Sequence, residues 1–160
     1  MAAIEDLPLW LRAVLKTYPW RRIDPVPVAT LHKPLAAAKV ALVTTAGLVV
    51  PGEAPFDAAV RGGDVSFRVI PEGTQVSALE EHHRSDSFDH SGIERDRNLA
   101  LPLDRLRELA AEGAIGSVAP RHLSFMGSIT APGRLVRDSA PRAADLLLED
   151  GVDVALLFPV

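Results

Sequence analysis

Aliphatic runs alternate with amphipathic segments along most of the chain, and this alternation predicts an α/β fold. Residues 40–44 form an apolar run closed by a threonine, which is typical of a buried strand in a parallel sheet. Residues 65–73 alternate apolar and polar side chains and form a second candidate strand. An amphipathic helix then starts near residue 103, Gly113 stands at its C-cap, and a short strand follows at residues 115–119.

The last part of the chain repeats this helix–glycine–strand order. Ser139 is the predicted N-cap, Pro141 falls in the first helical turn, and Gly151 ends the helix. A strand at residues 152–158 follows. Such units in series predict a three-layer α/β sandwich with a mostly parallel sheet. Right-handed crossovers would place the strand ends at one common edge of that sheet.

The beginning of the chain follows another pattern. Residues 5–18 carry apolar side chains at helical spacing and predict a short amphipathic helix. Four prolines between Pro19 and Pro34 then predict an extended arm. The sequence therefore divides into an N-terminal helix with a proline-rich arm, residues 1–39, and an α/β domain, residues 40–160.

Composition and charge exclude several classes of function. A chain of 160 residues with 48% hydrophobic and 24% charged residues is expected to fold as one globular domain. The net charge of −4 argues against a general nucleic-acid binder, and the lack of cysteine excludes disulfides and thiolate metal sites in this chain. We see neither a signal-peptide pattern nor an apolar run of membrane-span length, so we expect a cytoplasmic protein with no membrane partner.

A polar cluster at residues 80–98 is the first candidate for chemistry. Imidazoles and carboxylates are suitable ligands for a divalent metal, but their spacing here matches no metal-binding motif. A metal site, a substrate-facing polar loop and a solvated surface loop therefore all stay open. The residues concerned are His82, His83, Asp86, Asp89, His90, Glu94 and Asp96.

A second candidate follows the predicted strand at residues 115–119, where Arg121, His122 and Ser124 are expected at the strand-end edge. An arginine suits bidentate binding of a carboxylate, and a histidine can transfer a proton near neutral pH. The alternative is an arginine paired with a nearby acid and a capping histidine. Ser124 beside His122 is weak support for a hydrolase, because no G-x-S-x-G motif is present.

A third candidate is the segment that follows the first strand. Thr44 and Thr45 could offer hydroxyl groups, and the neighbouring backbone N–H groups, to an anion. The segment matches neither nucleotide-binding glycine motif, so a nucleotide site is not supported. A tight turn after the strand is the alternative interpretation.

Several stretches together resemble the selenoprotein B component of the glycine, sarcosine, betaine and D-proline reductases. The likeness is greatest to the D-proline reductase branch and extends from about Val40 to Val160. The blocks "SDSFDHSG", followed by "RDRN", and "APRHLSFMG" are its most specific parts. The other matching stretches are "ALVTTAGLVVPGEAPFD", "GDVSFRVIP" and "LLLEDGVDVALLFPV".

In that family, the strand that matches residues 153–160 leads directly into a selenocysteine within a U-x-x-C motif. The resemblance implies that this chain stops one residue before the selenocysteine, whose UGA codon is also a stop codon. The C-terminal part of the domain would then be missing, and the chain would be inactive as given. The resemblance implies selenocysteine in the full-length protein and no other cofactor in this chain.

The resemblance also implies an oxidoreductase subunit that reductively cleaves a C–N bond in a small amino acid or amine. A second reductase subunit and a thiol electron donor would be its partners, and a homo-oligomer is compatible with it. His90 and His122 are then the candidates for proton transfer. The candidates for substrate binding are Thr44, Thr45, Asp86, Asp89, Arg121 and Ser124.

Two other functions stay open from the residues alone. The chain could be a short, non-catalytic protein that binds a partner through the proline-rich arm and an exposed sheet edge. It could also be a metal-dependent hydrolase that uses His82, His83, Asp86 and His90.

Overall fold

The computed structural model describes residues 7–18, 22–85 and 90–160 of the chain. The contacts divide it into two compact units, Met1–Thr30 and Leu31–Val160. The first unit contains α1 (Leu9–Thr17), which confirms the predicted N-terminal helix. The predicted division at residues 39 and 40 stays a prediction. Among the described residues, no helix is long and apolar enough to cross a bilayer.

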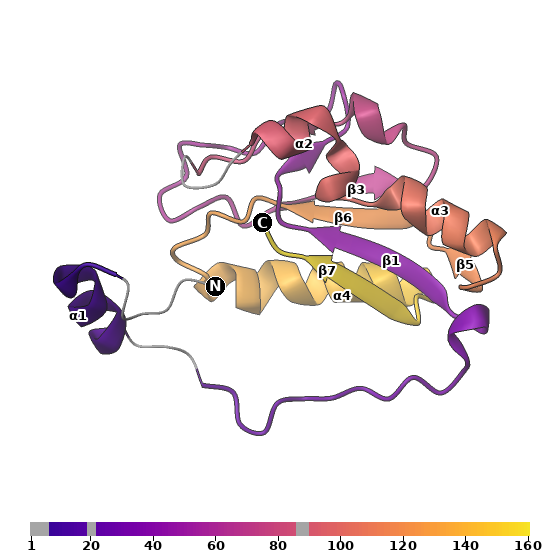
Figure 1. Ribbon diagram of the computed structural model, residues 1–160, viewed down its shortest axis with the longest axis horizontal. Coiled ribbons are helices and arrows are strands. Elements are labelled where there is room, and N and C mark those ends of the chain that lie inside the picture. Colours follow the sequence, from indigo (N-terminus) through magenta and orange to yellow (C-terminus); the bar gives the residue numbers. More distant parts are fainter. Residues whose placement is uncertain (1–6, 19–21, 86–89) are drawn as a thin grey trace. The chain divides into compact units, whose positions relative to one another are not determined.

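The larger unit is built on a five-stranded sheet in which β1 (Lys39–Thr44) has neighbours on both sides (Figure 1). On one side, β5 (Ser117–Val118) and then β6 (Arg121–Phe125) pair with it in parallel. On the other side, β7 (Val154–Phe158) pairs with it in parallel along five residues. β3 (Phe67–Pro71) lies antiparallel to β6. The predicted, mostly parallel α/β sheet is therefore confirmed.

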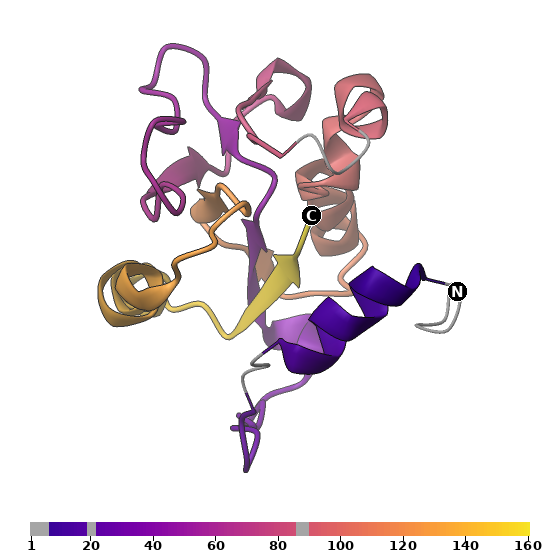
Figure 2. The same ribbon diagram turned by 90° about the vertical axis from the view of Figure 1, so that its left-hand side faces the viewer.

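Helices cover both faces of this sheet, as Figure 2 shows with the sheet seen nearly edge-on. The side chains of Val40 and Leu42 point to one face, where they pack in a core with residues of α2 and α3. The side chain of Ala41 points to the other face and packs with residues of α4. The predicted three-layer sandwich is thus confirmed. The covering helices are α2 (Ser91–Arg95), α3 (Leu103–Ala111) and α4 (Ala140–Glu149).

Short elements fill the connections between these layers. The pair β2–β4 matters most for the site, because β2 comes shortly after the carboxyl end of β1 and pairs antiparallel with β4. The short elements are η2 (Leu35–Ala37), β2 (Leu48–Val49), η3 (Val76–Ala78), β4 (Glu80–Glu81), η4 (Arg97–Leu99) and the π-helix η5 (Leu135–Ser139).

Two local predictions are wrong. Residues 121–125 form the strand β6 and not a loop after a strand. The two strands are separate because their register with β1 shifts by two residues, from Val40 opposite Val118 in β5 to Val43 opposite Leu123 in β6. Ser139 is not an N-cap, since its backbone is helical (φ −80°, ψ −41°) and η5 runs directly into α4.

The start of β1 is held by a close approach of two backbones. The amide of Gly116 donates to the carbonyl oxygen of Ala38, at 2.9 Å. A Cβ atom at Gly116 would lie 2.5 Å from the carbonyl carbon of Ala37 and 2.8 Å from the amide nitrogen of Ala38. Only a glycine fits there without a backbone shift.

We therefore expect Gly116→Ala to lower the free energy of unfolding by about 2 kcal/mol, since backbone atoms must move to accept the methyl group. Gly73→Ala is the matched control, because nothing lies within 4 Å of its added Cβ atom. Urea unfolding of both variants is the measurement. Equal midpoints for the two variants would contradict the close approach.

Candidate functional site

The carboxyl ends of three parallel strands meet at one edge of the sheet. Thr44, the last residue of β1, is in register with Ser124 of β6 and with Phe158 of β7. Beyond Thr44, the segment leaving β1 stays between its neighbours, because Ala46 forms a β-bridge with Met126. This carboxyl edge is where ligands usually bind in open α/β sheets.

Both threonines at this edge bond to the main chain. The Oγ1 atom of Thr44 is buried and accepts a hydrogen bond from the amide of Ala46, at 3.2 Å. The Oγ1 atom of Thr45 accepts from the amide of Val160, at 2.8 Å, and donates to the carbonyl oxygen of Val160, at 3.3 Å. Thr45 therefore holds the chain just beyond β7, while the predicted binding of substrate by either threonine stays a prediction.

The polar loop that follows β4 is anchored beside the same edge. Gly47 follows the segment that leaves β1, and its carbonyl oxygen accepts from the amide of His82, at 2.9 Å. Leu48 of β2 is in register with Glu81 of β4. Gly47 has a positive φ of 66°, and a Cβ atom there would lie 2.8 Å from the amide nitrogen of His83. The loop can approach the strand end this closely only because residue 47 is a glycine.

His90 is held between two acceptors at this position. Its Nδ1 atom lies 2.6 Å from Oε1 of Glu81, and its Nε2 atom lies 2.8 Å from the carbonyl oxygen of Ser85. Because carboxylate and carbonyl oxygens only accept, both ring nitrogens must donate, which favours the imidazolium form. The carbonyl group of Ser85, then Glu81, and also Glu94, raise the pKa of His90 above its ordinary value.

The neighbouring His83 has the opposite tendency. Its ring centre lies 6.2 Å from that of His90. Burial lowers the pKa of His83, the carboxylate of Glu81 opposes that effect, and the positive charge of His90 adds to it. Two imidazoles whose pKa values are shifted in opposite directions therefore lie near each other, and such perturbed groups are often found at functional sites.

The structure describes only some of the residues of the predicted metal site. Among the described residues, no group of three histidines, aspartates and glutamates could hold a metal ion. Asp86 and Asp89, which the sequence also offers as substrate-binding residues, lie outside the described residues. The Nε2 atom of His82 lies 3.5 Å from Oε2 of Glu80, which is a weak contact.

His122 is buried inside β6. Its Nδ1 atom accepts a hydrogen bond from the amide of Leu42, at 3.0 Å, where the register of the sheet beside β1 changes from β5 to β6. The proton of the neutral ring is therefore on Nε2, which makes no hydrogen bond with the described residues. Burial lowers the pKa of His122 to about 4. This geometry favours a structural role, and a role in proton transfer stays a prediction.

Arg121 and Ser124 lie at different ends of β6. The expected position of Arg121 at the carboxyl edge is wrong, because residue 121 begins the strand. Its Nε and Nη2 atoms donate to the two carboxylate oxygens of Asp150, at 2.8 and 2.7 Å, and this ion pair lowers the pKa of Asp150. Ser124 is buried beside Thr44 at the carboxyl edge, and its hydroxyl has no hydrogen-bond partner among the described residues.

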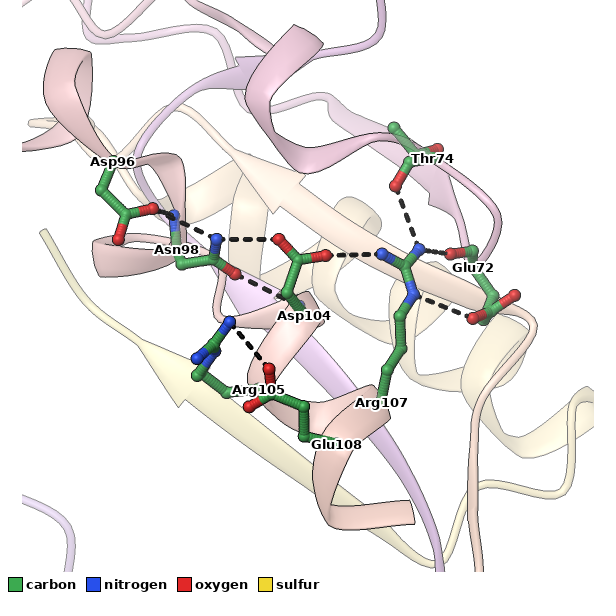
Figure 3. A network of polar contacts seen from close by, with 8 residues as sticks. All are labelled: Glu72, Thr74, Asp96, Asn98, Asp104, Arg105, Arg107 and Glu108. Carbon is green, nitrogen blue, oxygen red and sulfur yellow. Dashed lines mark hydrogen bonds and ion pairs between the residues drawn. The ribbon is translucent and has the colours of Figure 1, made fainter. Parts of the chain in front are cut away.

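Part of the polar block at residues 80–98 serves the fold (Figure 3). The Oδ1 atom of Asn98 accepts from the amide of Asp104, in the first turn of α3, at 3.2 Å. Pro102, the N-cap of α3, offers no side-chain hydrogen bond, so Asn98 caps the helix from outside. Arg107 joins this network to the end of β3 through Asp104 and Glu72, at 2.8 and 3.0 Å (Figure 3).

An apolar pocket of about 290 Å³ opens beside Thr45, on the face of the sheet that α4 covers. Val43, Phe125 and Leu157 line it from the three parallel strands, and Leu135 lines it from η5. It offers a hydrocarbon surface close to the hydroxyl that holds Val160. Such a pocket suits the aliphatic part of a small molecule.

Sequence reasoning missed the partner of His90. Glu81 lies within the predicted cluster at residues 80–98 but is not among its candidate residues, and only the antiparallel pairing of β2 with β4 brings it beside the end of β1. Gly47 belongs to the segment after the first strand, where a glycine often marks a close approach of two backbones. β2 and β4 are far apart in the sequence, so their pairing produces no periodic pattern that the sequence alone could show.

Comparison with known proteins identifies the family. Residues 13–159 match the family model for glycine/sarcosine/betaine reductase selenoprotein B, and the chain belongs to this family. It is 38% identical over 136 residues to the D-proline reductase subunit gamma of Acetoanaerobium sticklandii, a match that covers 84% of this chain and 54% of that protein. No solved structure matches the chain significantly.

Other relatives belong to reductase complexes of the same kind. The chain is 31% identical over 143 residues to the sarcosine reductase complex component B subunit beta of Peptoclostridium acidaminophilum. It is 31% identical over 144 residues to the betaine reductase complex component B subunit beta of the same organism. These matches cover 88% and 87% of this chain and 32% of each relative. The chain thus spans about half of the first relative and a third of these two.

The buried state of His122 makes stability depend on pH. Unfolding restores its ordinary pKa of 6.5, so the unfolded chain binds a proton that the folded chain, with a pKa of about 4, does not. This contribution to stability is complete above pH 6.5 and is lost as the pH falls towards 4. It amounts to about 3 kcal/mol over that range.

His122→Gln keeps an acceptor for the amide of Leu42 but cannot be protonated in this range. We expect the unfolding free energy of the wild type, minus that of the variant, to fall by about 3 kcal/mol from pH 7 to pH 4. Urea unfolding at several pH values measures it, and all other titrating groups are common to both proteins. Parallel curves for the two proteins would contradict the neutral, buried state of His122.

Proposed function

We propose that this chain is part of an oxidoreductase subunit that reductively cleaves a C–N bond in a small amino acid or amine. The nucleophile in this proposal is a selenocysteine that directly follows Val160 in the full-length protein. One observation carries the proposal. β7 ends at the same edge of the sheet as β1, and the segment that leaves β1 there is bonded to the loop that carries Glu81 and its partner His90. The family of the chain supports the reaction class.

The position after Val160 is chemically suited to a nucleophile. A selenol there would follow a parallel strand, at the point where α/β folds usually begin a helix. The free backbone N–H groups and the dipole of such a helix would stabilise its anion. The selenolate, like a thiolate, is the reactive form in covalent catalysis.

The proposed reaction has three stages. The selenolate attacks the carbon that bears the nitrogen, a C–Se bond forms, and the electron pair of the C–N bond leaves with the nitrogen, which takes up a proton. The thiolate of the U-x-x-C cysteine then attacks selenium, and a Se–S bond forms. The electron pair of the C–Se bond leaves with the carbon, which takes up a proton. A dithiol donor then reduces the Se–S bond and is itself oxidised to a disulfide.

His90 is the proton donor to the departing nitrogen in this proposal. Its raised pKa favours the protonated form, and its side chain is 30% exposed, which gives access to a substrate. The apolar pocket beside Thr45 takes the aliphatic part of the substrate. Asp86 and Asp89 remain candidates for binding its polar part. The second subunit, the thiol electron donor and a location in the cytoplasm are parts of the same proposal.

The test uses the full-length protein together with its partner subunit and a dithiol. D-proline, glycine, sarcosine and betaine are offered in turn, because the relatives' names contain these compounds. We expect turnover of at least one of them, followed by NMR, and no turnover with a variant in which the selenocysteine is replaced by alanine. Equal activity of the two proteins would refute the proposal.

A second prediction concerns the proton donor. His90→Gln should lower kcat by about a hundredfold or more, because general-acid catalysis contributes at least that much. Glu81→Gln should move the alkaline limb of the pH–rate profile to lower pH, because it removes a partner that raises the pKa of His90. His32→Gln, at an exposed histidine of the arm, is the control. An unchanged profile in Glu81→Gln would exclude His90 as the acid.

A further inference from the structure

We propose that Thr45 is a positioning residue that fixes the place and direction of the residue after Val160. The inference rests on the proposed function in so far as that residue is the nucleophile. It gives the side chain of Thr45 a role on the protein's own backbone and not on the substrate. Three features of the carboxyl edge support it.

The first feature is the end of the β1–β7 ladder. The amide of Thr45 donates to the carbonyl oxygen of Phe158, at 3.1 Å, which is the last ordinary bond of that ladder. The next amide of β7 that faces β1 is that of Val160, and in a continued ladder it would donate to the carbonyl oxygen of Thr45. That oxygen instead accepts from the amide of Gly127, at 2.7 Å, so the ladder does not continue to Val160, the position that matters for the proposed chemistry.

The second feature is the hydroxyl group of Thr45, which replaces the missing ladder. A hydroxyl has one proton and two lone pairs, so it can accept and donate at the same time. Here it accepts from the amide of Val160, at 2.8 Å, and donates to the carbonyl oxygen of Val160, at 3.3 Å. Two bonds, one to the backbone N–H and one to the backbone oxygen of Val160, restrict the backbone on both sides of its Cα atom.

The third feature is the packing that holds the Thr45 side chain in place. The amide of Gly127 donates to the carbonyl oxygen of Thr45, at 2.7 Å. A Cβ atom at Gly127 would lie 2.9 Å from Oγ1 and 3.0 Å from Cβ of Thr45. Thr45 is therefore enclosed between the backbones of Gly127 and Val160. A side chain held on both sides is suited to positioning, because little rotamer freedom remains to be lost.

The experiment compares the full-length protein with Thr45→Val, Thr45→Ser and the control Thr74→Val, which lies after β3. Thr45→Val has the same shape without the hydroxyl, whereas Thr45→Ser keeps the hydroxyl. The first measurement is hydrogen exchange at the amide of Val160. We expect exchange about fivefold to tenfold faster in Thr45→Val and near the wild-type rate in the other two. Melting temperatures show whether the variants are folded.

The second measurement is steady-state kinetics on the compound that the wild type turns over. We expect kcat to fall by roughly ten- to a hundredfold in Thr45→Val with little change in KM, and to recover in Thr45→Ser, because displacement of a nucleophile affects the chemical step. Unchanged exchange at Val160, or faster exchange with unchanged kcat, would overturn the inference. Equal activity of the wild type and its selenocysteine-to-alanine variant would instead overturn the proposed function, while the exchange data still report on Thr45.

Discussion

The parallel pairing of β7 with β1 is the interaction on which the rest of the molecule depends. It runs from Val40 to Thr44 on one strand and from Val154 to Phe158 on the other, so both strands end at the same level. This register brings the hydroxyl group of Thr45 within hydrogen-bonding distance of the amide of Val160. A shift of one residue would turn every side chain of β7 to the other face of the sheet and would separate the hydroxyl of Thr45 from its partners.

Two histidines show how the same side chain takes different states in one fold. His90 lies between a carboxylate and a carbonyl oxygen, which stabilise its charged form. His122 accepts a hydrogen bond from a backbone amide in the core, which requires a neutral ring. The first arrangement suits a proton donor at an accessible edge, and the second supplies an acceptor for the amide of Leu42 where the register changes between β5 and β6. The burial and the hydrogen-bond partners of each histidine, and not the residue type, therefore distinguish His90 in the candidate site from His122 in the core.

The strongly periodic parts of the fold could be predicted from the sequence. These are β1, α3, α4 and β7, because the apolar residues of each follow the spacing of a single strand or helix. β6 was not predicted, because Pro120 and the polar residues Arg121 and His122 conceal a strand whose ladder is completed by a side chain. In the site, His90 and Thr45 were recognised as candidates. Their partners, Glu81 and the backbone of Val160, were not, because long-range pairing brings them together.

The central claim is that this sheet edge presents a selenocysteine directly after Val160. The most direct measurement is the nucleotide sequence that follows the codon for Val160. The account predicts a TGA codon and, behind it, an open frame with a cysteine codon at the U-x-x-C spacing and a further helix–strand unit. A TAA or TAG codon, or a TGA codon with no coding sequence behind it, would contradict the account and leave the positioned edge without its nucleophile.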